Sequence, residues 1–276
     1  MKLKVSTIVL FLSACTFPAI SICAEKPDSL QSLLTISQSF LYAARTGEEV
    51  KEFQGLLENA EPGALDQQLK DDNTKKAFWL NIYNAYVQLL LKENPDTYRK
   101  RGQFFRAKQI VIAGHRLSLD KIEHGILRRS KAKWSLGHFN KLFPGRLEKK
   151  LRVDKLDYRI HFSLNCGAKS CPPIAYYDAD KINQQLSLAT KTYIKNEVAY
   201  DLEKNIVHLP AIMSWFRRDF GGKKGIKKML LDLNILPPGA NPSIQFKKYD
   251  WTLFLGNYKT NNDESGGIPF SRRRFY

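Results

Sequence analysis

The sequence predicts an α+β fold: a mostly helical single domain with short strands and hairpins around a cleft at a central strand and loop. Apolar residues at helical spacing are the commonest pattern in the 276-residue chain. The strand-like segments come in pairs joined by turn residues, which is typical of hairpins rather than of a doubly wound sheet. With 43% hydrophobic residues, the chain has enough apolar material for a core.

The predicted elements follow one another without an obvious linker. Helical spacing predicts helices over residues 28–59 (two helices, separated at Gly47), 74–93, 121–128, 178–196, about 210–221 and 225–233. Asn73 or Thr74 can cap the helix over 74–93, and Asp120 the helix over 121–128. Asp178 or Asp180 can begin the helix over 178–196. Hairpins are predicted over residues 109–119 and 198–209.

The helix over 74–93 carries three amides on one face. Asn81, Asn84 and Gln88 recur at helical spacing, with Thr74 and Lys92 in the same stripe. The spacing favours a solvated stripe over a polar stripe buried beneath a cleft.

The first 24 residues have the layout of a signal peptide. Lys2 and Lys4 form a basic start, an apolar run follows over residues 5–12, and Ala24 is a small residue suited to cleavage. Export to the periplasm or the medium is therefore expected. An alternative takes residues 12–15 as a lipobox, which would leave the protein lipid-anchored at Cys15. The expected organisation is a signal peptide (1–24), one globular domain (25–260) and a flexible basic tail (261–276).

The chain is strongly basic, with a formal net charge of +17. This charge favours an anionic partner such as a cell-envelope polymer or lipid head groups. A soluble basic surface without a dedicated partner explains the charge equally well. Basic and aromatic residues alternate over 129–153 without a compact nucleic-acid motif, so we expect those aromatics to pack onto the domain. No later segment has ~18 uninterrupted apolar residues, so the protein is not expected to span a membrane.

The stretch over residues 159–173 is the centre of the sequence. Ile160, Phe162 and Leu164 alternate with polar residues, which predicts a short half-buried strand. The pattern then breaks into a loop that contains Cys166 and Cys171. A strand end that delivers polar and thiol side chains to a loop is a plausible place for chemistry.

Five segments together resemble the family called domain of unknown function 547. In order they read AFWLNIYNA (77–85), LDKIEHGILR (119–128), YRIHFSLNCGAKSCPP (158–173), SWFRRDF (214–220) and YDW (249–251). Where the family often has Asp-Pro, this chain has Asp157-Tyr158. The resemblance implies a fold and a cleft rather than a settled activity. Together with the signal-like first 24 residues, it predicts an exported bacterial member of the family. The candidate site residues within its motifs are Asn81, Asn84, Glu123, His124, His161, Cys166 and Cys171.

Three hypotheses remain for the central loop. In the first, the protein is a cysteine-dependent hydrolase or transferase, with Cys166 or Cys171 as nucleophile and His124 or His161 as base. In this hypothesis Asn81, Asn84 or Glu123 orients the base. In the second, a Cys166–Cys171 disulfide pins the loop of a non-enzymatic module that binds the cell envelope. In the third, the cysteines and histidines hold zinc, although the spacing His-x4-Cys-x4-Cys is not a common one. We assign no cofactor and no metal.

Overall fold

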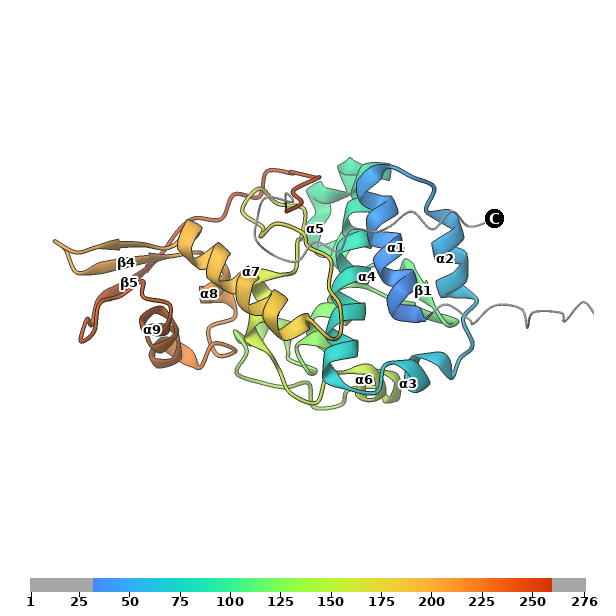
Figure 1. Cartoon of the computed structure of the whole chain (residues 1–276), viewed down its shortest axis with the longest axis horizontal. Coiled ribbons are helices and arrows are strands. Elements are labelled where there is room, and N and C mark those ends of the chain that lie inside the picture. The colour runs from blue at the N-terminus through green and yellow to red at the C-terminus, as the bar shows by residue number, and fades with distance from the viewer. Residues whose placement is uncertain (1–31, 260–276) are drawn as a thin grey trace, which may run out of the picture. The chain divides into compact units, whose positions relative to one another are not determined.

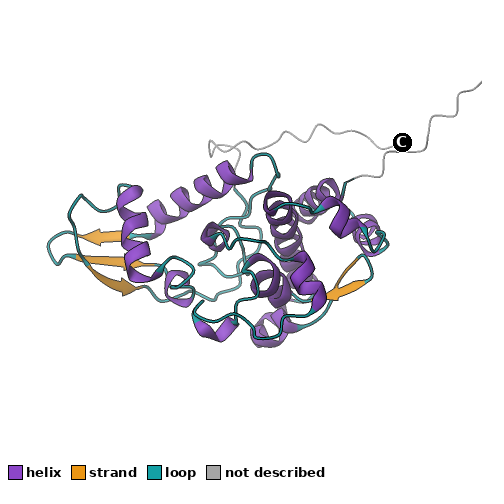
Figure 2. Cartoon of the chain, turned by 90° about the horizontal axis from the view of Figure 1, so that it is seen from below, coloured by secondary structure: helices purple, strands orange, loops and turns teal. Residues whose placement is uncertain are grey.

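The computed structural model describes residues 32–259, so the predicted signal peptide, with Cys15, and the predicted tail lie outside the described residues. About half of the model is helical and about a tenth is in strands, which confirms a mostly helical α+β single domain. Figure 2 shows these strands in two small groups, a three-stranded sheet at the left and a hairpin at the right.

The helices and strands alternate irregularly along the chain. The α-helices are α1 (Leu33–Thr46), α2 (Lys51–Glu58), α3 (Ala64–Gln68), α4 (Asp72–Glu93), α5 (Arg101–Arg106), α6 (Arg146–Leu151), α7 (Ile182–Glu197), α8 (Ile212–Trp215) and α9 (Gly222–Asp232). Tighter or wider helical turns are η1 (Pro95–Lys100), η2 (Lys121–Leu127, a π-helix), η3 (Lys133–Ser135) and η4 (Tyr158–Phe162). The strands are β1 (Ile110–Ile112), β2 (His115–Leu117), β3 (Ala199–Asp201), β4 (Ile206–Leu209) and β5 (Ser243–Phe246).

Helix α4 is the centre of the larger hydrophobic cluster, with α1 packed along it (Figure 1). Asp71 caps α4 by accepting hydrogen bonds from the backbone N–H groups of Asn73 and Thr74, so neither predicted cap is the true one. Asn81 and Asn84 are fully buried. The predicted solvated stripe is therefore wrong, because neighbouring segments cover α4 on the amide face as well as on the apolar faces.

A second hydrophobic cluster lies around the three-stranded sheet. The predicted hairpin over 198–209 is confirmed as β3 and β4, and β5 joins β4 in a parallel register that pairs Val207 with Ile244. Val207 and Leu209 of β4 are buried in the same cluster as Ile226 and Leu230 of α9. The predicted hairpin over 109–119 is also confirmed, as β1 and β2.

The predicted central strand is wrong. Residues Tyr158–Phe162 form a 3₁₀ helix, capped by Asp157, whose side chain accepts from the backbone N–H of Arg159. Ile160 packs in the larger hydrophobic cluster and Phe162 in the second one. Buried residues at alternate positions are typical of one face of a strand. Ile160 and Phe162 have that spacing, but each is buried in a different cluster, so they do not share a face.

Other boundaries also move. Helix α7 begins at Ile182, later than the predicted Asp178 or Asp180. Asp120 does not cap η2 through its side chain. Ser118 supplies that bond, because its hydroxyl accepts from the backbone N–H of Lys121. Within residues 32–259, no helix combines the length and the apolar character needed to cross a bilayer.

Candidate active site

The loop that carries both cysteines is tied to α4 by a buried amide. The Asn84 side chain donates to the carbonyl of Ser163 at 3.0 Å and accepts from the backbone N–H of Asn165 at 2.9 Å. The Asn165 side chain in turn donates to the carbonyl of Pro172 and accepts from the N–H of Gly167. This chain of bonds fixes both ends of the loop from inside.

Asn81 plays the same part for the next segment. Its side chain accepts from the N–H of Tyr177 at 2.9 Å and donates to the carbonyl of the same residue at 2.9 Å. Both predicted asparagines thus bind backbone, and their contacts position the loop rather than a reacting group.

The two cysteines face the same phenol. The Tyr249 hydroxyl lies 3.3 Å from Cys166 Sγ and 3.1 Å from Cys171 Sγ, and the backbone N–H of Cys166 donates to Cys171 Sγ. Both cysteines are free thiols, so the predicted alternative of a disulfide between them is not present in the structure. Cys166 is partly exposed, whereas Cys171 is buried.

The thiols have opposite pKa shifts. Hydrogen bonds from Cys171, Tyr249 and the backbone N–H of Ala168 hold the pKa of Cys166 below its ordinary value, against the opposing effect of burial. Burial and the neighbouring Cys166 raise the pKa of Cys171 well above its ordinary value. Burial also raises the pKa of Tyr249 far above that of a free phenol. The arrangement therefore favours one thiolate, on Cys166, with Cys171 and Tyr249 as protonated donors.

The far side of the cysteine loop is covered by a late segment of the chain. Lys169 donates its backbone N–H to the carbonyl of Thr252, and Phe254 donates its own to the carbonyl of Gly167. Gly167 has a φ of +83°, and a Cβ there would meet Leu91 at 2.7 Å. Glycine suits this turn for two reasons. The backbone has a positive φ, and a Cβ at this position would collide with the Leu91 side chain of α4.

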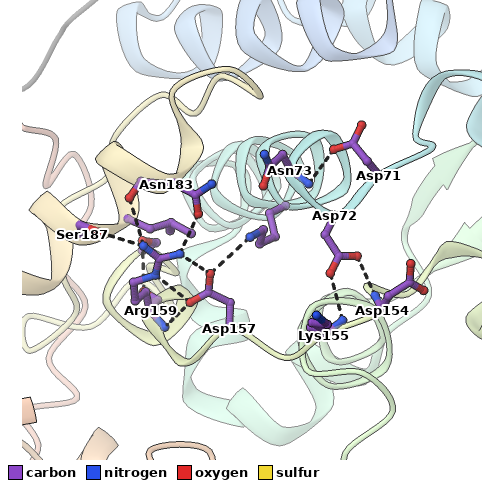
Figure 3. Close-up of polar contacts among 12 residues, drawn as sticks. Asp71, Asp72, Asn73, Asp154, Lys155, Asp157, Arg159, Asn183 and Ser187 are labelled. Carbon is purple, nitrogen blue, oxygen red and sulfur yellow. Dashed lines mark hydrogen bonds and ion pairs between the residues drawn. The ribbon is translucent and has the colours of Figure 1, made fainter.

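Helix η4 is anchored on its outer side by Arg159 (Figure 3). The Arg159 guanidinium donates to both carboxylate oxygens of Asp157 and to Asn183 and Ser187 of α7. Lys76 of α4 reaches Asp157 at 3.3 Å. These bonds hold η4 between α4 and α7, and η4 carries His161.

His161 belongs to a buried charged cluster. Its Nε2 lies 2.9 Å from Asp219 Oδ2, which also accepts from Nε of Arg128 at 2.7 Å. The Phe216 ring stacks on the His161 ring with centroids 4.0 Å apart, and the Arg128 guanidinium lies over the same Phe216 ring. Burial opposes ionisation of Asp219, but bonds from His161 and Arg128 hold its pKa below the ordinary value.

These contacts fix the His161 tautomer. An ionised Asp219 carboxylate can only accept, so Nε2 of His161 carries the proton and Nδ1 keeps the lone pair. Burial lowers the pKa of His161, so the ring is neutral at pH 7.

His124 is arranged differently. Its Nδ1 lies 3.0 Å from Nη1 of Arg128, which can only donate, so the lone pair of this ring is already used. Burial and then Arg128 lower the pKa of His124 to about 3. Glu123 Oε1 lies 3.5 Å from the ring, and Glu123 Oε2 accepts from the Tyr83 hydroxyl at 3.2 Å. Within residues 32–259, neither His124 nor His161 is hydrogen-bonded to a cysteine sulfur.

Comparison with known families adds one finding. The family model described as protein of unknown function, DUF547, matches residues 67–194. This chain belongs to the DUF547 family. No curated protein and no solved structure matches it.

The family match covers only part of the site of this DUF547 protein. All seven predicted site residues lie within residues 67–194, as does Arg128. Asp219 and Tyr249 lie after the match, although both complete the site. Sequence reasoning assigned no role to Arg128, Asp219 or Tyr249, but all three stand in the motifs that carried the resemblance. Among the residues that the structure describes, no three His, Cys, Asp or Glu side chains gather in a way that could hold a metal.

Proposed function

We propose that this DUF547 protein is a cysteine-dependent hydrolase or transferase with Cys166 as its nucleophile. The observation that carries the proposal is the Cys166 thiol, which belongs to a half-buried residue and whose pKa is lowered by three hydrogen-bond donors. A thiolate is the reactive form of cysteine, and such donors are what distinguish a reactive thiol from an inert buried one. Cys171, which is buried and has a raised pKa, acts as a donor to it.

The reaction would follow covalent acyl transfer. The Cys166 thiolate attacks a carbonyl carbon, forming a C–S bond and a tetrahedral oxyanion. The oxyanion collapses, the C–O or C–N bond to the leaving group breaks, and the leaving group takes a proton from solvent, which replaces the proton that Cys166 lost on ionising. Water then cleaves the S-acyl intermediate in a hydrolase, and another nucleophile does so in a transferase.

His161 is the candidate proton carrier. Its Nδ1 has no hydrogen-bond partner among residues 32–259, while Nε2 is bound by Asp219, which Arg128 holds in turn. His161 makes no hydrogen bond to either sulfur within the described residues, and its side chain is 1% exposed. It would therefore take part through a substrate group or a bound water that reaches Nδ1.

Alkylation kinetics test the proposal directly. The full chain is treated with iodoacetamide over a pH series, and the modified cysteine is identified by mass spectrometry. We expect Cys166 to react before Cys171, with a pH midpoint below that of a free thiol. The fast alkylation that we assign to Cys166 should persist in Cys171→Ser and should be abolished in Cys166→Ser. Equal rates at the two cysteines, or a faster Cys171, would contradict the proposal.

Turnover tests the second step. A panel of activated esters and thioesters should give a burst of leaving group, followed by slower release of the acyl group. Cys166→Ala should remove the burst, and Cys171→Ala should not. An acyl adduct on any residue other than Cys166 would rule out this mechanism.

A binding module remains the second candidate, favoured by the formal net charge of +17. Such a module would use its basic surface on an anionic cell-envelope polymer or on lipid head groups. A binding module with a Cys166–Cys171 disulfide is not supported, because both cysteines are free in the structure. Loss of envelope binding in a Cys166→Ser/Cys171→Ser double variant would favour that form, and unchanged binding would exclude it.

Export is part of either function. The basic start at Lys2 and Lys4 and the apolar run over residues 5–12 support a signal peptide cleaved after Ala24. N-terminal sequencing of protein recovered from outside the cytoplasm should begin at Glu25. A lipid-modified N-terminus at Cys15 would replace this proposal with the anchored form.

A further inference from the structure

The loop between η2 and α6 has its apolar side chains on the outside. Exposed fractions are 77% for Trp134, 60% for Phe139, 87% for Leu142 and 93% for Phe143. The expectation that these aromatics pack onto the domain is therefore wrong. Trp134 and Phe139 contact one another, with centroids 5.8 Å apart, rather than the core.

The small residues of the same loop are the buried ones. Ser135 and Ala132 are 5% and 8% exposed, and the Ser135 hydroxyl donates to the carbonyl of Ala132 and accepts from the N–H of Phe139. Ala132 donates its N–H to the carbonyl of Phe139, and Lys141 donates its own to the carbonyl of Ser130. These bonds fix the loop, so the outward position of its large apolar residues is built into its fold.

Contacts with the rest of the molecule hold the loop as well. Gly137 packs so closely against Asp219 and Arg218 that it has no space for a Cβ. Arg218 also donates its backbone N–H to the carbonyl of Leu136. The loop is thus anchored over the buried charged cluster.

The charge around these apolar residues has one sign. Residues 129–146 contain Arg129, Lys131, Lys133, Lys141 and Arg146 and no acidic residue. Asp120 and Glu148, which flank this segment, pair with Lys133 and Lys141. Arg129, Lys131 and Arg146 make no ion pair among the described residues, so they are the cations left for an anionic partner. Exposed aromatic and aliphatic side chains surrounded by cations suit the interface of a bilayer that contains anionic lipids.

We infer that the loop over residues 131–143 is a docking surface for an anionic lipid bilayer. Trp134, Leu142 and Phe143 enter the head-group region, while the surrounding cations contact lipid phosphates. A second copy of the chain fits less well, because pairing this face with itself brings cations against cations. Nucleic acid fits less well too, since it offers no apolar medium for Leu142 and Phe143.

Vesicle sedimentation of the full-length protein tests the inference. We expect binding to vesicles of phosphatidylcholine with phosphatidylglycerol, and much weaker binding to phosphatidylcholine alone. Leu142→Ser should weaken binding on the order of tenfold, because it removes one inserted aliphatic side chain. Leu202→Ser is the matched control, since Leu202 is 71% exposed elsewhere. It should bind as the unaltered protein does.

The cationic part has its own pair of variants. Arg146→Gln should weaken vesicle binding about fivefold. Arg116→Gln, at an exposed arginine of β2, should change it less. Every variant keeps both chain ends, so differences in binding report on the substituted residues. Equal effects of the loop and control variants would overturn the inference. So would loop-dependent binding of a DNA oligonucleotide without vesicle binding, or a loop-dependent dimer in sedimentation velocity.

Discussion

The two sides of the cysteine loop are built in different ways. On the α4 side, Asn84 and Asn165 bind backbone groups, and every such bond serves position. On the other side, the Tyr249 hydroxyl binds the two sulfurs. The first side therefore sets where the loop lies, and the second supplies a hydroxyl that lowers the pKa of the thiols it contacts. Substitutions on the two sides should separate stability from thiol reactivity.

The largest effect on stability is expected at the buried charged cluster that contains Arg128 and Asp219. Arg128 and Asp219 have side chains that are 0% exposed. Arg128→Met leaves a buried carboxylate without its cation, which should lower the free energy of unfolding by about 3–5 kcal/mol. Urea denaturation measures the change. Arg146→Met, at an exposed arginine, is the control and should cost far less. A cost below about 1 kcal/mol for Arg128→Met would show that the pair is not needed for stability.

Asn84→Ala should be the next most costly change. It leaves the Ser163 carbonyl and the Asn165 N–H buried without partners, at about 1–3 kcal/mol for each group. Asn59→Ala is a matched control, because the exposed Asn59 side chain donates a single hydrogen bond among the described residues, to the carbonyl of Gly55. If the thiol-alkylation midpoint of a folded Asn84→Ala protein shifts as much as that of Tyr249→Phe, the division between the two sides fails.

Acid should destabilise the protein before its carboxylates titrate. The pKa of His124 is about 3 in the folded protein and near 6.5 when unfolded, so between these values the unfolded chain binds the extra proton. The free energy of unfolding therefore falls as pH drops below about 6.5, by about 2 kcal/mol at pH 5 for this group. The pKa of His161 is also lowered, so its effect has the same sign.

Denaturation at pH 7 and pH 5 measures this loss. His124→Gln keeps an acceptor for Arg128 and should show a smaller loss between the two pH values. The same loss in the variant would assign the acid sensitivity to other groups.

Tyr249→Phe should have the smallest effect on stability and the largest on Cys166. Loss of the hydroxyl removes a donor to sulfur, so the pKa of Cys166 should rise and alkylation at pH 7 should slow. The free energy of unfolding should change by about 1 kcal/mol or less. Tyr200→Phe, which removes a hydroxyl bonded to Asn205, is the control. An unchanged alkylation midpoint in Tyr249→Phe would show that the phenol does not tune the thiol.

Sequence patterns predicted the elements that depend on interactions between residues close together in the chain. The hairpins at β1–β2 and β3–β4 have turn residues between short apolar runs, and both are confirmed. Helix α4 has a long apolar pattern and exists over almost the predicted range. The α4 amide stripe was misread because burial on the polar face depends on segments far away in sequence.

The same reasoning applies to the site. Cys166 and Cys171 stand out as residue types, but their state depends on Tyr249, which is 78 residues beyond Cys171. Likewise, the proton position on His161 depends on Asp219, 58 residues away. Spacing carries no information on such contacts, so it could nominate these residues without assigning their protonation. The loop aromatics were also missed, because composition does not tell which side of a loop faces outward.

The order in which the chain is made adds a consequence of the Tyr249 contact. Both cysteines leave the ribosome well before residue 249, and at about 5–20 residues per second the 78 residues after Cys171 take about 4–16 s. During that time neither sulfur has its phenol partner, and oxidants or other thiols can reach both. A non-native disulfide could form in the time between synthesis of the cysteine loop and synthesis of the segment that contains Tyr249. We therefore expect both thiols to react with oxidants faster in a chain that ends before residue 249 than in the full chain.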